Sequence, residues 1–186
     1  MAETLRPKRG GFLRPFGAAV FIRDYLMGQG SRYGAEDIDP QVGAPQTDIH
    51  AAYKTALLRA IALDQATAAE EESAARENRA ISPERIEELA EGFLARIPLK
   101  FSRMRYHSFL TYFRNLKALG WVEPTGQTEP STIQDSYPDA PARTYYRLTA
   151  AGKGVGEPEI NDPVTALYGY TREQRSARRR RYQRLP

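Results

Sequence analysis

The sequence predicts a mainly helical protein with a small β-hairpin near its C-terminal end. Two observations support this fold class. Between residues 15 and 119, apolar side chains recur at the three- and four-residue spacing of amphipathic helices. After Gly120 the period changes, and residues 143–149 alternate between two kinds of side chain as a β-strand does. The hairpin therefore follows the last of the amphipathic helices.

The first predicted helix spans Pro15 to Met27, and residues 28–46, rich in glycine and proline, predict a long loop. Thr47 can cap a second helix. Its apolar side chains form one stripe, made of Ile49, Tyr53, Ala56, Leu57, Ala60 and Leu63. Beyond Asp64 the large apolar residues stop, although good helix formers continue to Arg79. We interpret residues 64–79 as a solvated helical extension. A coiled-coil or dimer arm is the alternative, and it should show sustained apolar heptads.

A third helix begins at Ser82 and Pro83, a capping hydroxyl followed by proline at the first helical position. Its apolar residues keep helical spacing as far as Ile97, and Pro98 ends it. A short connector leads into a fourth helix from about Ser102 to Leu119, which Gly120 ends. Two helices joined by so short a turn predict a helix-turn-helix.

The fourth predicted helix has two chemically distinct faces. At 100° per residue, the inward face consists of Tyr106, Phe109, Phe113 and Leu116, and the outward face of Arg103, His107, Thr111 and Arg114. Arginine, histidine and threonine side chains suit contacts with bases and phosphates in a major groove. A solvated face is the alternative, but such a face normally mixes acidic with basic residues. Residues 96–122 contain no Asp or Glu, which favours the DNA-facing interpretation.

Positive charge is concentrated in two stretches of a chain whose net charge is only +4. Residues 96–122 hold six Lys and Arg, and the segment from Arg172 holds seven Arg against one Glu. A phosphate backbone is the commonest target of such segregated charge. The Arg-rich end can bind phosphates as a flexible arm, through release of counterions. It can also dock on the protein's own acidic residues at 70–72 and 84–91, or stay solvated.

Two short strands follow Gly120. Trp121 to Glu123 predicts the first, residues 124–142 form a turn-rich stretch, and residues 143–149 predict the return strand. Alternation places Thr144, Tyr146 and Leu148 toward the core and Arg143, Tyr145 and Arg147 on the other side. Two strands and a loop after a helix-turn-helix make a wing.

Residues 112–123 (Tyr-Phe-Arg-Asn-Leu-Lys-Ala-Leu-Gly-Trp-Val-Glu) and 142–152 (Ala-Arg-Thr-Tyr-Tyr-Arg-Leu-Thr-Ala-Ala-Gly) resemble winged helix-turn-helix regulators. The PadR-like group is the most similar, and the broader MarR-like set comes next. The resemblance covers residues 82–152. It implies that the helix from Ser102 is the recognition helix and that Arg143 and Arg147 of the wing touch DNA backbone or minor groove. The long helix before Ser82, the long wing loop and the Arg-rich end depart from the group.

The sequence thus predicts a winged helix-turn-helix, mainly α with a small β-wing and an extra long helix. Its parts are a basic arm (1–14), the winged-helix domain with a long helical insertion (15–155) and the Arg-rich tail (156–186). The expected partner is double-stranded DNA, and the expected activity is transcriptional regulation. The predicted DNA-binding residues are Lys100, Arg103, Arg105, His107, Thr111, Arg114, Lys117, Arg143, Tyr145, Arg147, Arg178, Arg179, Arg180 and Arg181.

We expect no enzyme and no cofactor or metal, because the chain has no Cys and no Ser or acid stands in a defensible place beside His50 or His107. The longest apolar N-terminal run, Ala18 to Ile22, is too short to cross a membrane, so a cytoplasmic protein is expected. The sequence leaves open whether the protein forms a homodimer. The alternative function is a winged-helix adaptor in a larger protein or ribonucleoprotein assembly.

Overall fold

The computed structural model describes residues 15–169 with the exception of residues 103 and 132. The predicted basic arm, Arg103 and the Arg-rich end, including Arg178 to Arg181, therefore lie outside the described residues. The helices are α1 (Ala18–Leu26), α2 (Gln46–Glu77), α3 (Pro83–Leu94), α4 (Tyr106–Ala118), α5 (Ala150–Lys153), α6 (Glu157–Asn161) and α7 (Pro163–Tyr168). Two 3-10 turns are η1 (Gly30–Tyr33) and η2 (Leu99–Ser102). The strands β1 (Ala44–Pro45), β2 (Val122–Glu129) and β3 (Arg143–Leu148) form an antiparallel sheet in the order β1-β3-β2.

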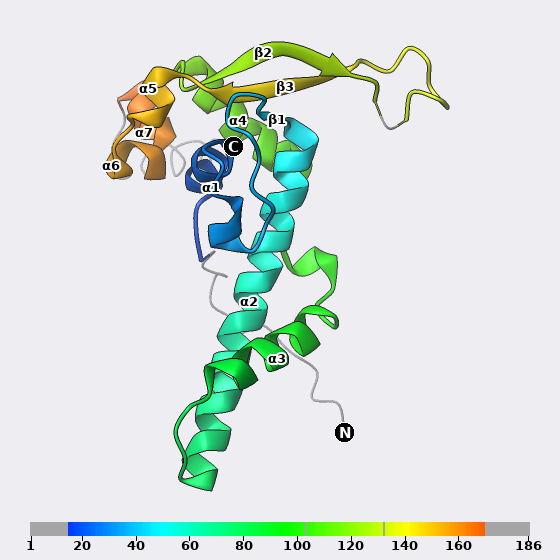
Figure 1. Cartoon of the computed structure of the whole chain (residues 1–186). Coiled ribbons are helices and arrows are strands. Elements are labelled where there is room, and N and C mark those ends of the chain that lie inside the picture. Colours follow the sequence, from blue (N-terminus) through cyan, green and yellow to red (C-terminus); the bar gives the residue numbers. More distant parts are fainter. Residues whose placement is uncertain (1–14, 103, 132, 170–186) are drawn as a thin grey trace, which may run out of the picture.

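The molecule has two parts, a head and an arm (Figure 1). The head contains α1, the first turns of α2, α4, the sheet and the short helices α5 to α7. The β2–β3 hairpin lies along its top edge, and the hairpin loop extends beyond it on the side away from α5 to α7. The arm, residues 61–97, is the far part of α2 with α3 packed on it, and it projects away from the sheet.

The head is organised around a single aromatic core. Its largest fully buried side chains include Tyr53, Phe21, Phe109 and Phe113, which come from α2, α1 and α4. Tyr146 of β3 packs edge-on against Phe113, with ring centroids 5.0 Å apart. Apolar burial of this kind is the main stabilising contribution to a domain of this size. Three of the predicted inward residues of α4 and two of β3 thus meet in one core: Phe109, Phe113, Leu116, Tyr146 and Leu148.

The long second helix is confirmed, and its predicted apolar stripe is buried at Ile49, Tyr53, Ala56 and Leu57. The interpretation of residues 64–79 as a solvated extension is wrong in part, because α3 covers one side of them. Ala66, Glu70 and Ala74 are buried there. Alanine leaves room for a close helix–helix approach, so a segment without large apolar residues can still form a packed surface.

The predicted pairing of the third and fourth helices as a helix-turn-helix is wrong. The α3 helix contributes no residue to the core of the head; its Ala90 packs with Ala62 and Ala66 of α2. The α4 helix packs instead against α1 and the first turns of α2. A short connector fixes the distance between two helix ends but leaves their packing partners open, and here the apolar stripe of α3 lies against α2.

Several boundaries differ from the sequence-based expectation. The predicted loop at 28–46 contains η1 and β1, and β2 continues to Glu129 although it includes Pro124. Proline is tolerated there because β2 is an edge strand of the sheet. Beyond residue 155, α6 and α7 extend the packed head, where Ile160 is buried and Glu157 pairs with Arg23 of α1. The described part of the predicted tail is therefore folded.

Candidate nucleic-acid interface

The α4 helix presents two faces, as its helical periodicity predicted. Phe109, Phe113 and Leu116 are buried, whereas His107, Thr111 and Arg114 are exposed. The hydroxyl of Thr111 donates to the carbonyl of His107, 3.3 Å away, and keeps its acceptor capacity. The outward stripe therefore offers a cation, a hydroxyl and an imidazole over two helical turns.

Tyr106 does not belong to the core as predicted, since 39% of it is exposed. It is the first residue of α4, where no preceding turn covers it. Its ring lies 5.2 Å from the ring of His50 in α2. Sequence periodicity alone assigns a terminal residue to a face but does not report how the helix end is covered.

His50 anchors the entry into α4. Its Nε2 lies 3.2 Å from the carbonyl oxygen of Met104, two residues before α4 begins, and its ring packs against Phe109. Burial, and to a lesser extent the charge of Lys54, lowers the pKa of His50. The neutral imidazole therefore holds this bend and positions the start of the exposed stripe.

The cations around α4 have few acidic neighbours. Lys100, Arg105 and Arg114 are exposed, and none of them forms an ion pair within the described part of the chain. Lys117 lies over the ring of Tyr146, with its Nζ 4.9 Å from the ring centroid, and it too has no described carboxylate partner. A cation without an internal partner keeps its full charge for a ligand.

The three predicted wing residues, Arg143, Tyr145 and Arg147, differ from the cations around α4 because each contacts a carboxylate. Arg143 is largely buried, with 16% of its side chain exposed, and it pairs with Asp48 and with Glu129, the latter at 2.9 Å. Arg147 pairs with Glu123 at 3.0 Å. The hydroxyl of Tyr145 donates to Glu129 across 2.7 Å, and this bond raises the pKa of Tyr145. We expected these basic and aromatic side chains to be exposed on the outer side of β3. They are only partly exposed, and carboxylates on β2 and α2 engage all three.

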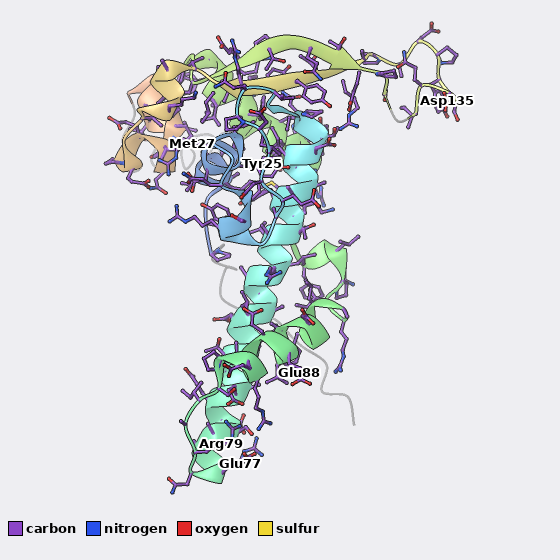
Figure 2. All side chains as sticks on the ribbon, in the orientation of Figure 1. Tyr25, Met27, Glu77, Arg79, Glu88 and Asp135 are labelled. Atoms are coloured by element: carbon purple, nitrogen blue, oxygen red, sulfur yellow. The ribbon has the colours of Figure 1, made fainter. Side chains whose placement is uncertain are left out.

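The hairpin loop is acidic rather than basic. Residues 124–142 contain Glu129, Asp135 and Asp139 but no Lys or Arg, and Figure 2 shows Asp135 at the far end of the loop. Ile133 and Tyr137 are exposed there. Such a loop is repelled by phosphates, so the hairpin loop adds nothing to the positive charge of α4 and the residues just before it.

The structure adds two exposed residues to the predicted set. Arg96 follows α3 and is exposed without a described ion pair, and Ser108 is exposed on α4. The absence of acidic residues from 96–122 was the signal for Arg96. Helical periodicity places Ser108 about 100° from the centre of the outward stripe, so no sequence signal pointed to it. Among the described residues, Lys100, Arg105, His107, Thr111, Arg114 and Lys117 are the predicted site residues that remain exposed without an acidic partner.

No family model, curated protein or solved structure matches this chain. Within the described ranges, no helix is both long and apolar enough to cross a membrane.

Proposed function

We propose that this chain is a winged-helix DNA-binding protein, a transcriptional regulator whose α4 helix enters the major groove. The proposal assigns base contacts to His107, Thr111 and Arg114, and phosphate contacts to Lys100, Arg105 and Lys117. An α-helix fits the major groove, and arginine can contact a guanine edge with two hydrogen bonds. Exposed Lys and Arg around the helix supply the sequence-independent attraction to the backbone.

The order of elements in the head supports this proposal. A first helix, a short strand, a second helix and then α4 are followed by two strands, and all three strands share one antiparallel sheet. In this interpretation, the first turns of α2 take the place of the helix before the recognition helix. The arm is then an insertion between those two helices. The sequence-based assignment of α3 to that role is thereby replaced.

One observation carries the proposal. The exposed face of α4 combines hydrogen-bond donors with cations that have no described internal acidic partner, whereas the neighbouring cations Arg143 and Arg147 are both paired. The unpaired cations thus lie on the exposed face of α4, and the opposite face of this helix is fixed in the aromatic core. A rigid element with a free polar face is what base reading requires.

The acidic hairpin loop restricts the orientation of the duplex. Asp135 and Asp139 oppose a wing tip lying along phosphates. We therefore propose that base reading falls to α4, with the hairpin loop directed away from the backbone. The sequence resemblance implied that the wing touches DNA, whereas this proposal gives the hairpin loop no contact with DNA.

The experiment is selection from a random duplex pool at near-physiological salt. Enrichment of a defined motif supports base reading, because electrostatic attraction alone binds all duplexes alike. The matched control is a variant with His107, Thr111 and Arg114 all changed to Ala, which keeps the aromatic core of α4. Wild-type protein that enriches no motif, or a triple variant that enriches the same one, would contradict the proposal. Binding to a protein or ribonucleoprotein without duplex selection would instead support the adaptor.

A further inference from the structure

The hydroxyl of Tyr106 has no hydrogen-bond partner within the described part of the chain. Tyr106 is the first residue of α4, and 39% of it is exposed. Its described contacts are with aromatic rings. The hydroxyls of Tyr33 and Tyr145, by contrast, each donate to a carboxylate of the chain. A phenol hydroxyl is both a donor and an acceptor, so Tyr106 keeps this capacity for a ligand.

Two aromatic rings hold the side chain of Tyr106 in place. The ring of His50 meets it at an interplanar angle of 61°, with ring centroids 5.2 Å apart. The fully buried ring of Phe109 stacks on it at 6.4 Å. Burial also raises the pKa of Tyr106, so the hydroxyl keeps its proton. A side chain that is already ordered loses little conformational entropy when it binds a ligand.

Tyr106 lies on a flank of α4 rather than within its outward stripe. At 100° per residue, its direction differs by about 100° from the centre of that stripe. It differs by only about 20° from the direction of Lys117, about three turns further along the helix. Lys117 lies over the ring of Tyr146 in β3, and Tyr146 also acts electrostatically on Tyr106. The first and last turns of α4 thus present Tyr106 and Lys117 on the same flank, on the side of β3.

The chain around this hydroxyl is positively charged. Arg105 immediately precedes Tyr106, Lys100 lies in the preceding turn η2, and both are exposed. Residues 96–122 contain no Asp or Glu. Cations attract a phosphate, and tyrosine hydroxyls are among the groups that donate to phosphates in DNA complexes. A flank that combines a hydroxyl with cations therefore suits the DNA backbone, whereas the outward stripe suits the bases.

We propose that the hydroxyl of Tyr106 donates a hydrogen bond to a phosphate of the DNA backbone, and that His50 is the residue that positions its ring. This inference rests on the proposed function, since it needs a duplex against α4. Tyr106 and Lys117 then hold the backbone at the two ends of one flank of the helix. Contacts of this kind fix the register of a protein on the duplex without reading its sequence.

A tyrosine contact differs from a lysine contact in its salt dependence. Lys117 is charged, so the loss of its phosphate contact lowers the slope of log affinity against log salt by about 0.9. The hydroxyl of Tyr106 is uncharged and displaces no counterion. Its loss should therefore weaken binding to every duplex by the same factor at every salt concentration.

The test is fluorescence anisotropy of the full chain with two duplexes, one selected from the random pool and one of unrelated sequence, at several salt concentrations. Tyr106→Phe removes only the hydroxyl and should weaken binding to both duplexes about tenfold, with the slope unchanged. Its thermal midpoint should match that of wild type, because the hydroxyl has no described partner. Lys117→Ala should lower the slope. Tyr112→Phe, on another flank of α4, is the matched control and should bind like wild type.

A double-mutant cycle tests the role of His50. His50→Gln keeps an N–H group for the carbonyl of Met104 but removes the ring beside Tyr106. It should weaken duplex binding severalfold on its own and have no further effect in a Tyr106→Phe protein. Equal effects in both backgrounds would overturn the positioning role of His50.

Two results would overturn the contact and leave the proposed function in place. One is a Tyr106→Phe protein that binds both duplexes as tightly as wild type. The other is a loss confined to the selected duplex, because it would assign the hydroxyl to a base. Wild-type protein that binds neither duplex would overturn the proposed function, and this contact with it.

Discussion

Arg79 holds the buried carboxylate of Glu70 with two nitrogens, and its Nη2 lies 2.9 Å from Oε2 of Glu70. The backbone N–H of Ser82 donates to the same carboxylate at 3.0 Å. Glu70 thereby joins the far end of α2 to the turn before α3, where Figure 2 shows Arg79 beside Glu77 at the tip of the arm. Glu70 thus fixes the end of the arm, although this part of α2 lacks large apolar side chains.

This arrangement predicts a pH dependence. The hydrogen bond from Arg79, followed by that from Ser82, lowers the pKa of Glu70 to about 2 from its ordinary 4.5. Because the folded protein favours the charged form, the contribution is complete above pH 4.5 and is lost as the pH falls toward 2. Urea unfolding of wild type and Glu70→Gln between these pH values should show a difference that shrinks on acidification. Glu71→Gln, exposed one residue away, is the control. A constant difference would contradict this role.

Phe113→Ala should destabilise the head by about 3–5 kcal/mol, because it removes a fully buried ring and leaves a cavity. Thermal or urea unfolding measures the loss, and Thr111→Ala on the opposite face should change stability little. Unchanged stability in the Phe113 variant would mean that α4 is turned differently about its axis.

Arg114→Ala should cost about 1–3 kcal/mol in discrimination at one base pair and leave stability nearly unchanged. Fluorescence anisotropy with a selected duplex and its single-site variants measures the effect. An equal loss on every duplex would assign Arg114 to phosphate contacts instead.

Arg143→Ala should lower the stability of the head by about 1 kcal/mol, since it leaves Asp48 and Glu129 without their shared cation. Its effect on affinity for duplex should be small, because that charge is already neutralised within the chain. Lys117→Ala is the comparison, with an expected loss on all duplexes. A larger loss of affinity from Arg143 than from Lys117 would restore the wing to the interface.

Deletion of residues 172–186 removes seven Arg outside the described residues. If they bind phosphates, affinity for all duplexes should fall by a similar factor while the selected motif stays the same. The slope of log affinity against log salt should decrease by about 0.9 for each phosphate that these arginines neutralise. An unchanged slope with loss of a protein or ribonucleoprotein partner in a pull-down would identify the segment as a docking peptide.

The sequence alone determined the features that depend on neighbouring residues. The start of α3 at Ser82 and Pro83, the end of α4 before Gly120 and the two faces of α4 follow from capping chemistry and helical period. The inward placement of Tyr146 and Leu148 follows from strand alternation in the same way. The absence of acidic residues around α4 also anticipated its unpaired cations.

Only the tertiary structure decided which elements meet. Asp48 and Arg143 are 95 residues apart in the chain, and no local sequence pattern predicts that one side chain neutralises the charge of the other. The assignment of α3 to α2 rather than α4, and the burial of Glu70, depend likewise on which apolar and charged surfaces match in space. Periodicity states which side of a helix is buried, whereas the identity of the covering element is a property of the whole fold.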